Sequence, residues 1–259
     1  MNHISKNSVV SPKAELGDNI TIKDFAVVED DVVIGSNTVI EQHAIIKNGT
    51  TIGDNCKIYN GAVLSQDPQD FTYTGQPTTL TIGDNTTIRE YVTISKGTVK
   101  MGKTSVGENN YIMAYCHIAH DCKLGNNIIL VNSVEVAGHV VIDDWVYVST
   151  LVGIHQFVRV GKHSLITYLT RVSQDVPPFI IAGGYDLSYM GLNTVGLRRR
   201  GFDNKRIGSI KQAYEIIYNS KFNVSDALKH VEDTLEMTDD IKDIVSFIES
   251  SERGIVRNR

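Results

Sequence analysis

Residues 116–123 read CHIAHDCK, so two histidines stand three residues apart and an aspartate directly follows the second. Three interpretations fit this spacing. In the first, His117 and His120 are surface residues without a role. In the second they bind a metal ion, since neutral imidazole is a common zinc ligand. In the third, His120 is a general base that Asp121 orients, and it removes a proton from a substrate hydroxyl or amine. The motif alone does not distinguish them, and the elements that position it must decide.

The composition is that of an ordered globular protein of 259 residues, with 41% hydrophobic and 21% charged residues. A net charge of −5 argues against nucleic acid as the main partner. The N-terminus has no apolar signal-like segment, and no later stretch approaches the roughly 18 apolar residues of a membrane span, so we expect no integral membrane association. The three cysteines Cys56, Cys116 and Cys122 form no C-x-x-C pair, which indicates a reduced, cytoplasmic protein.

A six-residue repeat dominates the chain. Of the 29 positions spaced by six from Ile4 to Val172, 26 hold Ile, Leu or Val, and the exceptions are Asp70, Gln76 and Lys100. Neither a helix, with a period of 3.6, nor an amphipathic strand, with a period of 2, produces this spacing. Hexapeptide repeats of this kind are typical of a parallel β-helix, in which each hexad forms one short strand and one corner.

The sequence also has a longer period of eighteen residues, which is three hexads. Glycine follows the aliphatic residue at Gly17, Gly35 and Gly53, and again at Gly107 and Gly125. Three hexads per turn therefore predict a triangular coil with its aliphatic residues stacked inside. The spacing is 30 residues from Gly53 to Gly83 and 24 from Gly83 to Gly107. These excesses over eighteen predict two loops that leave the coil near residues 68–80 and 97–104. Long loops in a compact repeat fold are usually functional.

The pattern changes towards the C-terminus. The repeat fades after Val172 at QDVPPF, where we expect two prolines to stop the ladder. From about residue 190 apolar residues recur at helical spacing, and Ser225 and Thr238 are candidate N-caps. The sequence thus predicts a β-helix over residues 1–187 and a C-terminal α-helical domain over residues 188–259.

The repeat also places the histidines. His120 follows the aliphatic Ile118 by two residues, so it lies at a corner, and His139 comes about one turn of the coil later. We therefore expect His120 and His139 to be neighbours, with His117 and His155 in the same groove. The remaining histidines, His3, His43, His163 and His230, have no such relation and are expected on the surface.

A set of fragments then resembles one known family. It comprises HIAHDC (117–122), AGHV (137–140), HQF (155–157), QDVPP (174–178), GLN (191–193) and GLRRRGF (196–202), together with the loop sequences PQDFTYTG (68–75) and KGTVKMG (96–102). In this order and spacing they are similar to the hexapeptide-repeat acyl-[acyl-carrier-protein]–UDP-N-acetylglucosamine O-acyltransferases. Those enzymes catalyse the first step of lipid A biosynthesis in Gram-negative bacteria.

The resemblance implies a homotrimer of left-handed parallel β-helices with active sites between neighbouring subunits. It implies that His120 is the general base, that Asp121 orients it, and that the backbone N–H of Gly138 is the oxyanion donor. Further matching positions are implied to contact the nucleotide sugar, the acyl group or the acyl carrier protein: Asp70, His117, His139, His155, Gln156, Asn193, Arg199 and Arg200. No metal or other cofactor is implied, since acyl-carrier protein is a co-substrate.

The residue types suit acyl transfer. A sugar hydroxyl becomes a good nucleophile when a base removes its proton, and a thioester carbonyl becomes an oxyanion when it is attacked. The run Arg198–Arg200 suits an acidic carrier protein or a pyrophosphate, because guanidinium groups bind phosphate with two hydrogen bonds.

Three positions depart from the family pattern. Thr72 stands where many relatives have a lysine near the sugar nucleotide, and Val195 replaces an acidic or polar residue. Tyr168 stands where relatives that accept long acyl chains have glycine, so we expect this chain to take shorter acyl groups.

Several alternatives stay open at this point. The same site would acylate a 3-amino UDP-sugar analogue through nitrogen, and the loss of the loop lysine leaves that choice open. A metal enzyme resembling γ-class carbonic anhydrases would need stoichiometric zinc or iron. A non-catalytic scaffold would bind a nucleotide sugar without turnover.

Overall fold

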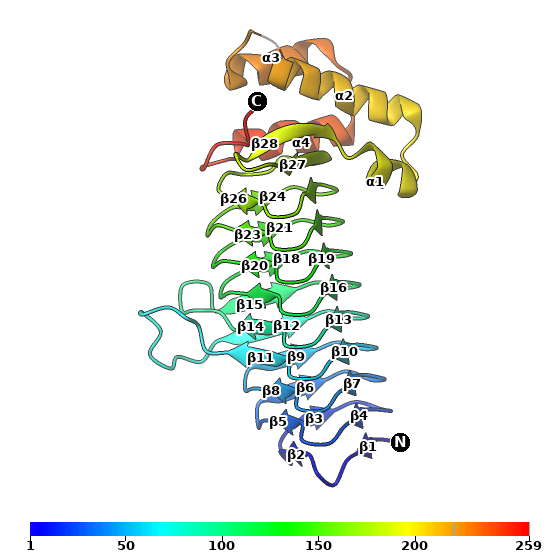
Figure 1. Ribbon diagram of the computed structural model, residues 1–259, viewed down its shortest axis with the longest axis vertical. Coiled ribbons are helices and arrows are strands. Elements are labelled where there is room, and N and C mark those ends of the chain that lie inside the picture. Colours follow the sequence, from blue (N-terminus) through cyan, green and yellow to red (C-terminus); the bar gives the residue numbers. More distant parts are fainter. Residues whose placement is uncertain (220, 259) are drawn as a thin grey trace.

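The computed structural model describes residues 1–219 and 221–258. Short parallel strands and tight corners alternate through most of the chain, and the coil they form is covered at one end by helices (Figure 1). Every third strand returns to the same flat face, so the coil has three faces, called here faces A, B and C. This arrangement confirms the parallel β-helix that the hexad predicts.

The strands divide among the faces in regular order. Face A holds β1 (His3–Ile4), β4 (Thr21–Ile22), β7 (Val39–Ile40), β10 (Lys57–Ile58), β13 (Thr87–Ile88), β16 (Tyr111–Ile112), β19 (Ile129–Leu130), β22 (Tyr147–Val148), β25 (Leu165–Ile166), β27 (Ile180–Gly183) and β28 (Ser188–Leu192). Face B holds β2 (Val9–Val10), β5 (Val27–Val28), β8 (Ile45–Ile46), β11 (Val63–Gln66), β14 (Thr93–Ser95), β17 (His117–Ile118), β20 (Glu135–Val136), β23 (Gly153–Ile154) and β26 (Arg171–Val172). Face C holds β3 (Glu15–Leu16), β6 (Val32–Ile34), β9 (Thr50–Ile52), β12 (Thr79–Ile82), β15 (Lys103–Val106), β18 (Lys123–Leu124), β21 (Val141–Ile142) and β24 (Arg159–Val160).

The core is the column of aliphatic residues inside the coil. On face B, Ile118 lies in register between Ile94 of the preceding coil and Val136 of the next, and all three are fully buried. The residue before each of them points outward, so a two-residue strand carries one core residue and one surface residue. Hydrophobic burial along this column stabilises the fold, and it fixes which side chains face outward near the histidines.

Corners need backbone angles that most residues avoid. At the corner between faces C and A, six coils have asparagine with φ between 57° and 59°, namely Asn19, Asn37, Asn55, Asn85, Asn109 and Asn127. Asparagine tolerates this left-handed region better than most residues with a side chain. The corner between faces B and C uses the same left-handed region at Asp121, His139 and Phe157, with φ between 61° and 65°. The candidate active-site residues therefore lie at a repeated turn.

Two segments leave the coil as predicted. One runs over residues 67–78, between β11 and β12, and the other over residues 96–102, between β14 and β15. Both project from the corner between faces B and C, and Figure 1 shows the longer one standing out from the coil in cyan. Hydrogen bonds between Gly97 and Thr79, and between Thr79 and Gly102, join their bases.

The prolines do not stop the ladder, so that prediction was wrong. Pro177 and Pro178 lie in a corner, and Val176 before them still donates to the Arg159 carbonyl. After them β27 pairs in parallel with β25, and β28 then folds back antiparallel to β27. Prolines that occupy a corner remove no strand N–H, which is why the coil continues for another turn.

The C-terminal segment begins with strand β28 rather than with a helix. Four helices follow: α1 (Thr194–Arg199), α2 (Asn204–Asn219), α3 (Val224–Thr234) and α4 (Asp239–Glu249). Thr238 is the N-cap residue of α4, as predicted, but Ser225 lies inside α3, whose N-cap is Asn223. The Asn223 side chain accepts a hydrogen bond from the Asp226 N–H. Whether residues 1–187 and 188–259 behave as separate domains stays a prediction.

Aromatic residues join this segment to the coil. In the upper coils the corner asparagines give way to Trp145, His163 and Phe179, whose rings stack in sequence. Phe202 packs edge-on against His163, and the Arg200 guanidinium lies over Trp145. His163 is therefore half-buried beneath the C-terminal segment, and its predicted surface position was wrong.

Candidate active site

Three successive coils build the site at the corner between faces B and C. Gly138 lies one coil beyond His120, and His139 lies one coil beyond Asp121. The His139 N–H donates to the His120 carbonyl at 3.1 Å, and the Phe157 N–H donates to the Gly138 carbonyl at 3.1 Å. The predicted neighbourhood of His120 and His139 is confirmed, since their ring centroids lie 5.2 Å apart.

Asp121 holds the His120 ring. The His120 Nδ1 lies 2.9 Å from the Asp121 Oδ2, and the Asp121 side chain is fully buried. An ionised carboxylate only accepts hydrogen bonds, so the ring proton lies on Nδ1 and the Nε2 lone pair is free to accept another proton. This is the tautomer that a general base requires.

A threonine from the second loop fixes Asp121 from the other side. The Thr98 N–H and hydroxyl donate to Asp121 Oδ1 and Oδ2 at 2.8 and 2.7 Å, and the Thr104 hydroxyl accepts from the Asp121 N–H at 2.8 Å. The second loop therefore supplies hydrogen bonds to a buried carboxylate, which would be costly to bury without partners.

The first loop brings Asp70 to the opposite side of the ring. Its Oδ2 lies 3.7 Å from the His120 Nε2. Thr72 donates to Asp70 Oδ1 through its hydroxyl at 2.6 Å and its N–H at 2.8 Å, and these bonds lower the pKa of the Asp70 carboxyl. Thr72, which departs from the family's lysine, thus orients a carboxylate beside the candidate base.

Glycine is required at position 138 by the His120 ring. A Cβ placed on Gly138 would lie 2.6 Å from His120 Cε1 and 2.8 Å from Nε2, too close for any side chain. Among residues 1–219 and 221–258, no group accepts a hydrogen bond from the Gly138 N–H. A backbone donor without a partner therefore lies next to the imidazole.

A cavity of about 720 Å³ lies above these groups on face B. His120, Gly138, His117, His155 and Gln156 all line it, which confirms the expected common groove. The His117 Nδ1 lies 2.7 Å from the Thr93 hydroxyl, and burial lowers the pKa of His117. Several polar side chains thus converge on one opening, as in a small-molecule site.

His139 lies just outside that cavity. Its ring stacks on Phe157 with centroids 4.6 Å apart, and its Nε2 lies 3.6 Å from Asp121 Oδ2. Burial lowers the pKa of His139. The ligand atoms of His120, Asp121 and His139 lie within 4.8 Å of one another, so the set has the spacing of a metal site.

The remaining predicted residues lie elsewhere in the protomer, and none lines this cavity. Asn193 is buried as the N-cap of α1, where it accepts from the Gly196 N–H and donates to the His163 carbonyl. Arg199 is exposed, and Arg200 is half-buried against Trp145. Tyr168 is 65% exposed at the corner between faces A and B. Their assigned roles stay predictions.

Several lining residues were not identified from the sequence. Gln69 of the first loop, Thr93, Glu135 and Arg171 all border the cavity. Thr93 and Glu135 occupy the outward positions in register with His117 on the neighbouring coils. The eighteen-residue period was a usable signal for Glu135, whereas Thr93 precedes His117 by 24 residues because the second loop adds six. Thr98 carried no such signal, because only the closure of its loop places it against Asp121.

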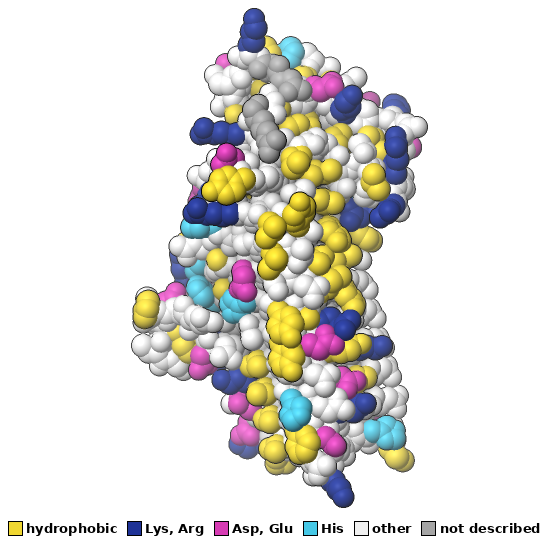
Figure 2. Space-filling model, in the orientation of Figure 1, with side chains coloured by type: hydrophobic (Ala, Val, Ile, Leu, Met, Phe, Trp, Pro, Cys, Tyr) yellow, Lys and Arg dark blue, Asp and Glu magenta, His cyan; other side chains and the backbone are white. Residues whose placement is uncertain are grey.

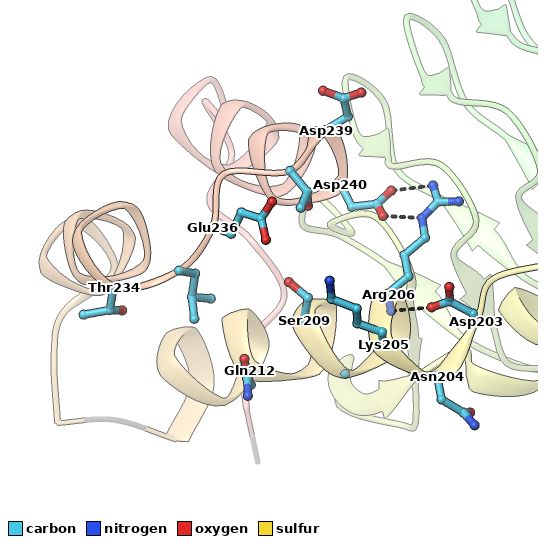
Figure 3. Close-up of a pocket in the computed structure, with 13 residues that line it drawn as sticks. Asp203, Asn204, Lys205, Arg206, Ser209, Gln212, Thr234, Glu236, Asp239 and Asp240 are labelled. Atoms are coloured by element: carbon cyan, nitrogen blue, oxygen red, sulfur yellow. Dashed lines mark hydrogen bonds and ion pairs between the residues drawn. The ribbon is translucent and has the colours of Figure 1, made fainter.

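A larger cavity, of about 840 Å³, lies between α2, α3 and α4 (Figure 3). Its most prominent interaction is the ion pair between Arg206 and Asp240, in which Nη2 donates to Oδ1 at 2.8 Å. Arg206 also packs over the Phe202 ring. The Arg206–Asp240 pair joins α2 to α4, and among the residues that the structure describes the cavity places no histidine beside an unpaired backbone N–H, so the smaller cavity at His120 is the better candidate for acyl transfer.

Comparison with known proteins identifies the family. A sequence model described as UDP N-acetylglucosamine O-acyltransferase, domain 2, matches residues 175–256, and one described as bacterial transferase hexapeptide (six repeats) matches residues 31–66 and 103–138. A curated acyl-[acyl-carrier-protein]–UDP-N-acetylglucosamine O-acyltransferase from Herminiimonas arsenicoxydans is 45% identical over 262 residues, which cover 99% of this chain and 100% of that relative. The chain belongs to this acyltransferase family.

Solved acyltransferases of the same family share the whole architecture. A UDP-N-acetylglucosamine acyltransferase from Bacteroides fragilis superposes with a TM-score of 0.96 at 45% identity, covering 98% of this chain and 100% of that one. The Francisella novicida enzyme gives a TM-score of 0.96 at 41% identity, covering 100% and 94%. The chain is thus an enzyme with the expected fold, a left-handed parallel β-helix with C-terminal helices. In the part of this acyltransferase that the structure describes, no helix has the length and apolar character needed to cross a bilayer.

Proposed function

We propose that this enzyme transfers a (3-hydroxy)acyl group from acyl carrier protein to the 3-hydroxyl of UDP-N-acetylglucosamine, the first step of lipid A biosynthesis. The observation that carries the proposal is the pairing of two groups at one cavity. His120 offers a free Nε2 lone pair, and Gly138 beside it offers an N–H without a partner. A base next to an oxyanion donor is what acyl transfer to a hydroxyl needs.

The reaction follows from this geometry. His120 Nε2 takes the proton of the sugar 3-hydroxyl as that oxygen attacks the thioester carbonyl. The carbonyl oxygen becomes an oxyanion, which the Gly138 N–H stabilises. The tetrahedral intermediate then releases the phosphopantetheine sulfur, and the imidazolium returns its proton to that thiolate. Asp121 stabilises the imidazolium in between, and Asp70 lies near enough to add to this effect.

The predicted homotrimer has support on the molecular surface. At the corner between faces A and B, one column of coils carries exposed Phe25, Tyr91, Tyr115, Leu151 and Leu169, with His43, Gly61 and Ser133 on the coils between them. Figure 2 shows hydrophobic side chains gathered in a line along the coil. An extended apolar strip of this kind favours contact with other copies of the chain. Sedimentation equilibrium tests it, with three chains per particle expected and a monomer contradicting the trimer.

A trimer also explains how predicted site residues that lie far from the His120 cavity could contact a substrate. Asn193, Arg199 and Arg200 lie in the C-terminal segment and do not reach the His120 cavity of their own protomer. In an active site between subunits, they act on a neighbour's cavity and hold the nucleotide sugar or the acyl carrier protein. Exposed Arg198 and Arg199 suit either the pyrophosphate or an acidic carrier surface.

The reaction needs no metal in this proposal, although His120, Asp121 and His139 have a suitable spacing. Both Asp121 oxygens already accept hydrogen bonds from Thr98, and Oδ2 also faces the His120 Nδ1. A metal would have to displace these bonds and would occupy the base. Full activity after dialysis against EDTA is the expected result, whereas loss of activity restored by zinc or iron would favour a metal enzyme.

One experiment tests the function itself. The purified enzyme is incubated with acyl-acyl-carrier proteins of graded chain length and either UDP-N-acetylglucosamine or its 3-amino analogue, and products are read by mass spectrometry. An ester of UDP-N-acetylglucosamine is the expected product. An amide formed only with the analogue would replace O-acylation by N-acylation. Absence of any product would favour a non-catalytic scaffold.

A further inference from the structure

Arg253 lies against His155 from a part of the chain that the sequence did not connect with the site. One nitrogen of its guanidinium, Nη2, lies 3.3 Å from the His155 Nδ1 and 3.3 Å from the Ser173 carbonyl oxygen. His155 lines the same cavity as His120 and Gly138. The C-terminal tail therefore reaches a residue of the candidate active site, 98 positions away along the chain.

The tail is fastened next to this contact. Asp175 accepts from the Ser251 hydroxyl at 2.7 Å, its N–H donates to the Gly254 carbonyl at 3.0 Å, and its carbonyl accepts from the Val256 N–H at 2.9 Å. Asp175 also accepts from the Arg159 N–H of β24 at 2.8 Å. Because residues on both sides of Arg253 are bound to Asp175, the backbone that carries the Arg253 side chain is held against the coil.

The His155 Nδ1 faces two groups with opposite demands. The Gln156 carbonyl oxygen, 3.1 Å away, can only accept a hydrogen bond, so it favours a proton on Nδ1. The Arg253 guanidinium can only donate, so it favours a lone pair on Nδ1. A hydrogen bond from a charged donor is the stronger of the two. A ring that accepts from Arg253 at Nδ1 carries its proton on Nε2.

The rest of the Arg253 side chain gains little from its position. Its Nε is buried and has no hydrogen-bond partner among the described residues. A buried N–H without a partner costs stability, which an aliphatic side chain at this position would avoid. The recorded hydrogen bonds of the guanidinium are therefore made by Nη2, to the Ser173 carbonyl and to His155.

From this arrangement we propose that Arg253 is a positioning residue, which fixes the Nε2–H tautomer of His155 so that His155 donates a hydrogen bond into the active-site cavity. His120 and His155 then play opposite roles in one cavity, since His120 accepts a proton at Nε2 and His155 offers one. The group that His155 recognises is an acceptor oxygen of the substrate, such as an amide carbonyl. This inference rests on the proposed acyl transfer for its kinetic consequence only.

Neutron diffraction from crystals exchanged into D₂O tests the tautomer directly. The deuteron of His155 is expected on Nε2 in the parent protein and on Nδ1 in Arg253→Met, where only the Gln156 carbonyl faces Nδ1. A deuteron on Nδ1 in the parent, or the same tautomer in both proteins, would overturn the proposal. This result does not depend on catalysis, so it is separate from the fate of the proposed function.

Kinetics then test the consequence. Arg253→Met is expected to reduce kcat/KM about tenfold, the size of one lost hydrogen bond, with most of the change in KM. Arg253→Lys keeps a charged donor and is expected to recover part of the loss. Arg257→Met, on the same tail but without a contact to His155, is the matched control and should behave as the parent does. Equal losses in Arg253→Met and Arg257→Met, with matching falls in melting temperature, would reduce Arg253 to a structural role.

Discussion

The side chain of Asp121 accepts two hydrogen bonds from Thr98, one from its N–H at 2.8 Å and one from its hydroxyl at 2.7 Å. These bonds hold the carboxylate in the plane where it meets His120 Nδ1. The loop over residues 96–102 therefore acts as a support for the candidate base. Its effect on catalysis passes through a neighbour rather than through contact with substrate.

Replacing Thr98 by valine removes one of the two bonds and keeps the other. Thr98→Val is expected to lower kcat about tenfold, because the lost hydrogen bond loosens Asp121 and with it the His120 ring. KM should change little, since Thr98 does not line the cavity. Steady-state kinetics check this, with Thr51→Val on the exposed side of β9 as control. An unchanged kcat would mean that the N–H bond alone suffices.

His163 makes folding stability depend on pH. Burial, followed by the nearby Arg200 charge, lowers its pKa from 6.5 to about 4. The unfolded chain then binds more protons than the folded protein between these values, so stability rises with pH across that window and levels off above it. His117 and His139 contribute in the same direction, because burial lowers the pKa of each.

Urea unfolding between pH 4.5 and 7.5 measures this slope. In His163→Phe, which keeps an aromatic ring between Trp145 and Phe179, the free energy of unfolding should rise less steeply with pH than in the parent. It should not become flat, since His117 and His139 remain. Parallel curves for the two proteins would contradict the assignment of the slope to His163.

Tyr168 is expected to limit acyl chain length. Its ring is 65% exposed in the protomer, so Tyr168→Gly should leave the fold intact while opening space for longer chains. Competition between acyl-acyl-carrier proteins of graded length is expected to show a shift towards longer chains in Tyr168→Gly and none in Tyr168→Phe. The same preference in all three proteins would show that chain length is set elsewhere.

The interior column tolerates no charge. Ile58 is fully buried in β10, and the adjacent Lys57 points outward. Ile58→Asp is expected to abolish cooperative folding, because an unpaired carboxylate in an aliphatic column has no hydrogen-bond partner. Lys57→Asp, one residue away in the same strand, should melt within a few degrees of the parent. Circular dichroism against temperature distinguishes the two, and similar melting would contradict the inward direction of the hexad position.

The hexad made the coil predictable, because one strict period fixes the strand, the corner and the inward side chain together. It also brought His120 beside His139 and gathered His117 and His155 in one groove. Pro177 and Pro178 misled the prediction, since their usual effect on a ladder depends on whether they occupy a strand or a corner. Only the structure shows that these two lie in a corner.

The contacts that the loops and the C-terminal tail make with the coil could not be predicted from the sequence. Thr98 meets Asp121, and Arg253 meets His155, only because the chain folds back over a coil whose own period says nothing about these segments. The predicted surface position of His163 was wrong for a related reason. Its corner position is polar in the lower coils, and it becomes buried only where the C-terminal segment covers it.

The assignment of His120 as general base is tested most directly by the rate of acyl transfer in His120→Ala. A fall in kcat of about a hundred- to ten-thousandfold is expected, with a melting temperature close to that of the parent, since the ring lies at a corner outside the aliphatic core. His230→Ala, which changes an exposed histidine of α3, should retain full activity. A His120→Ala protein that folds normally and turns over like the parent would contradict the account.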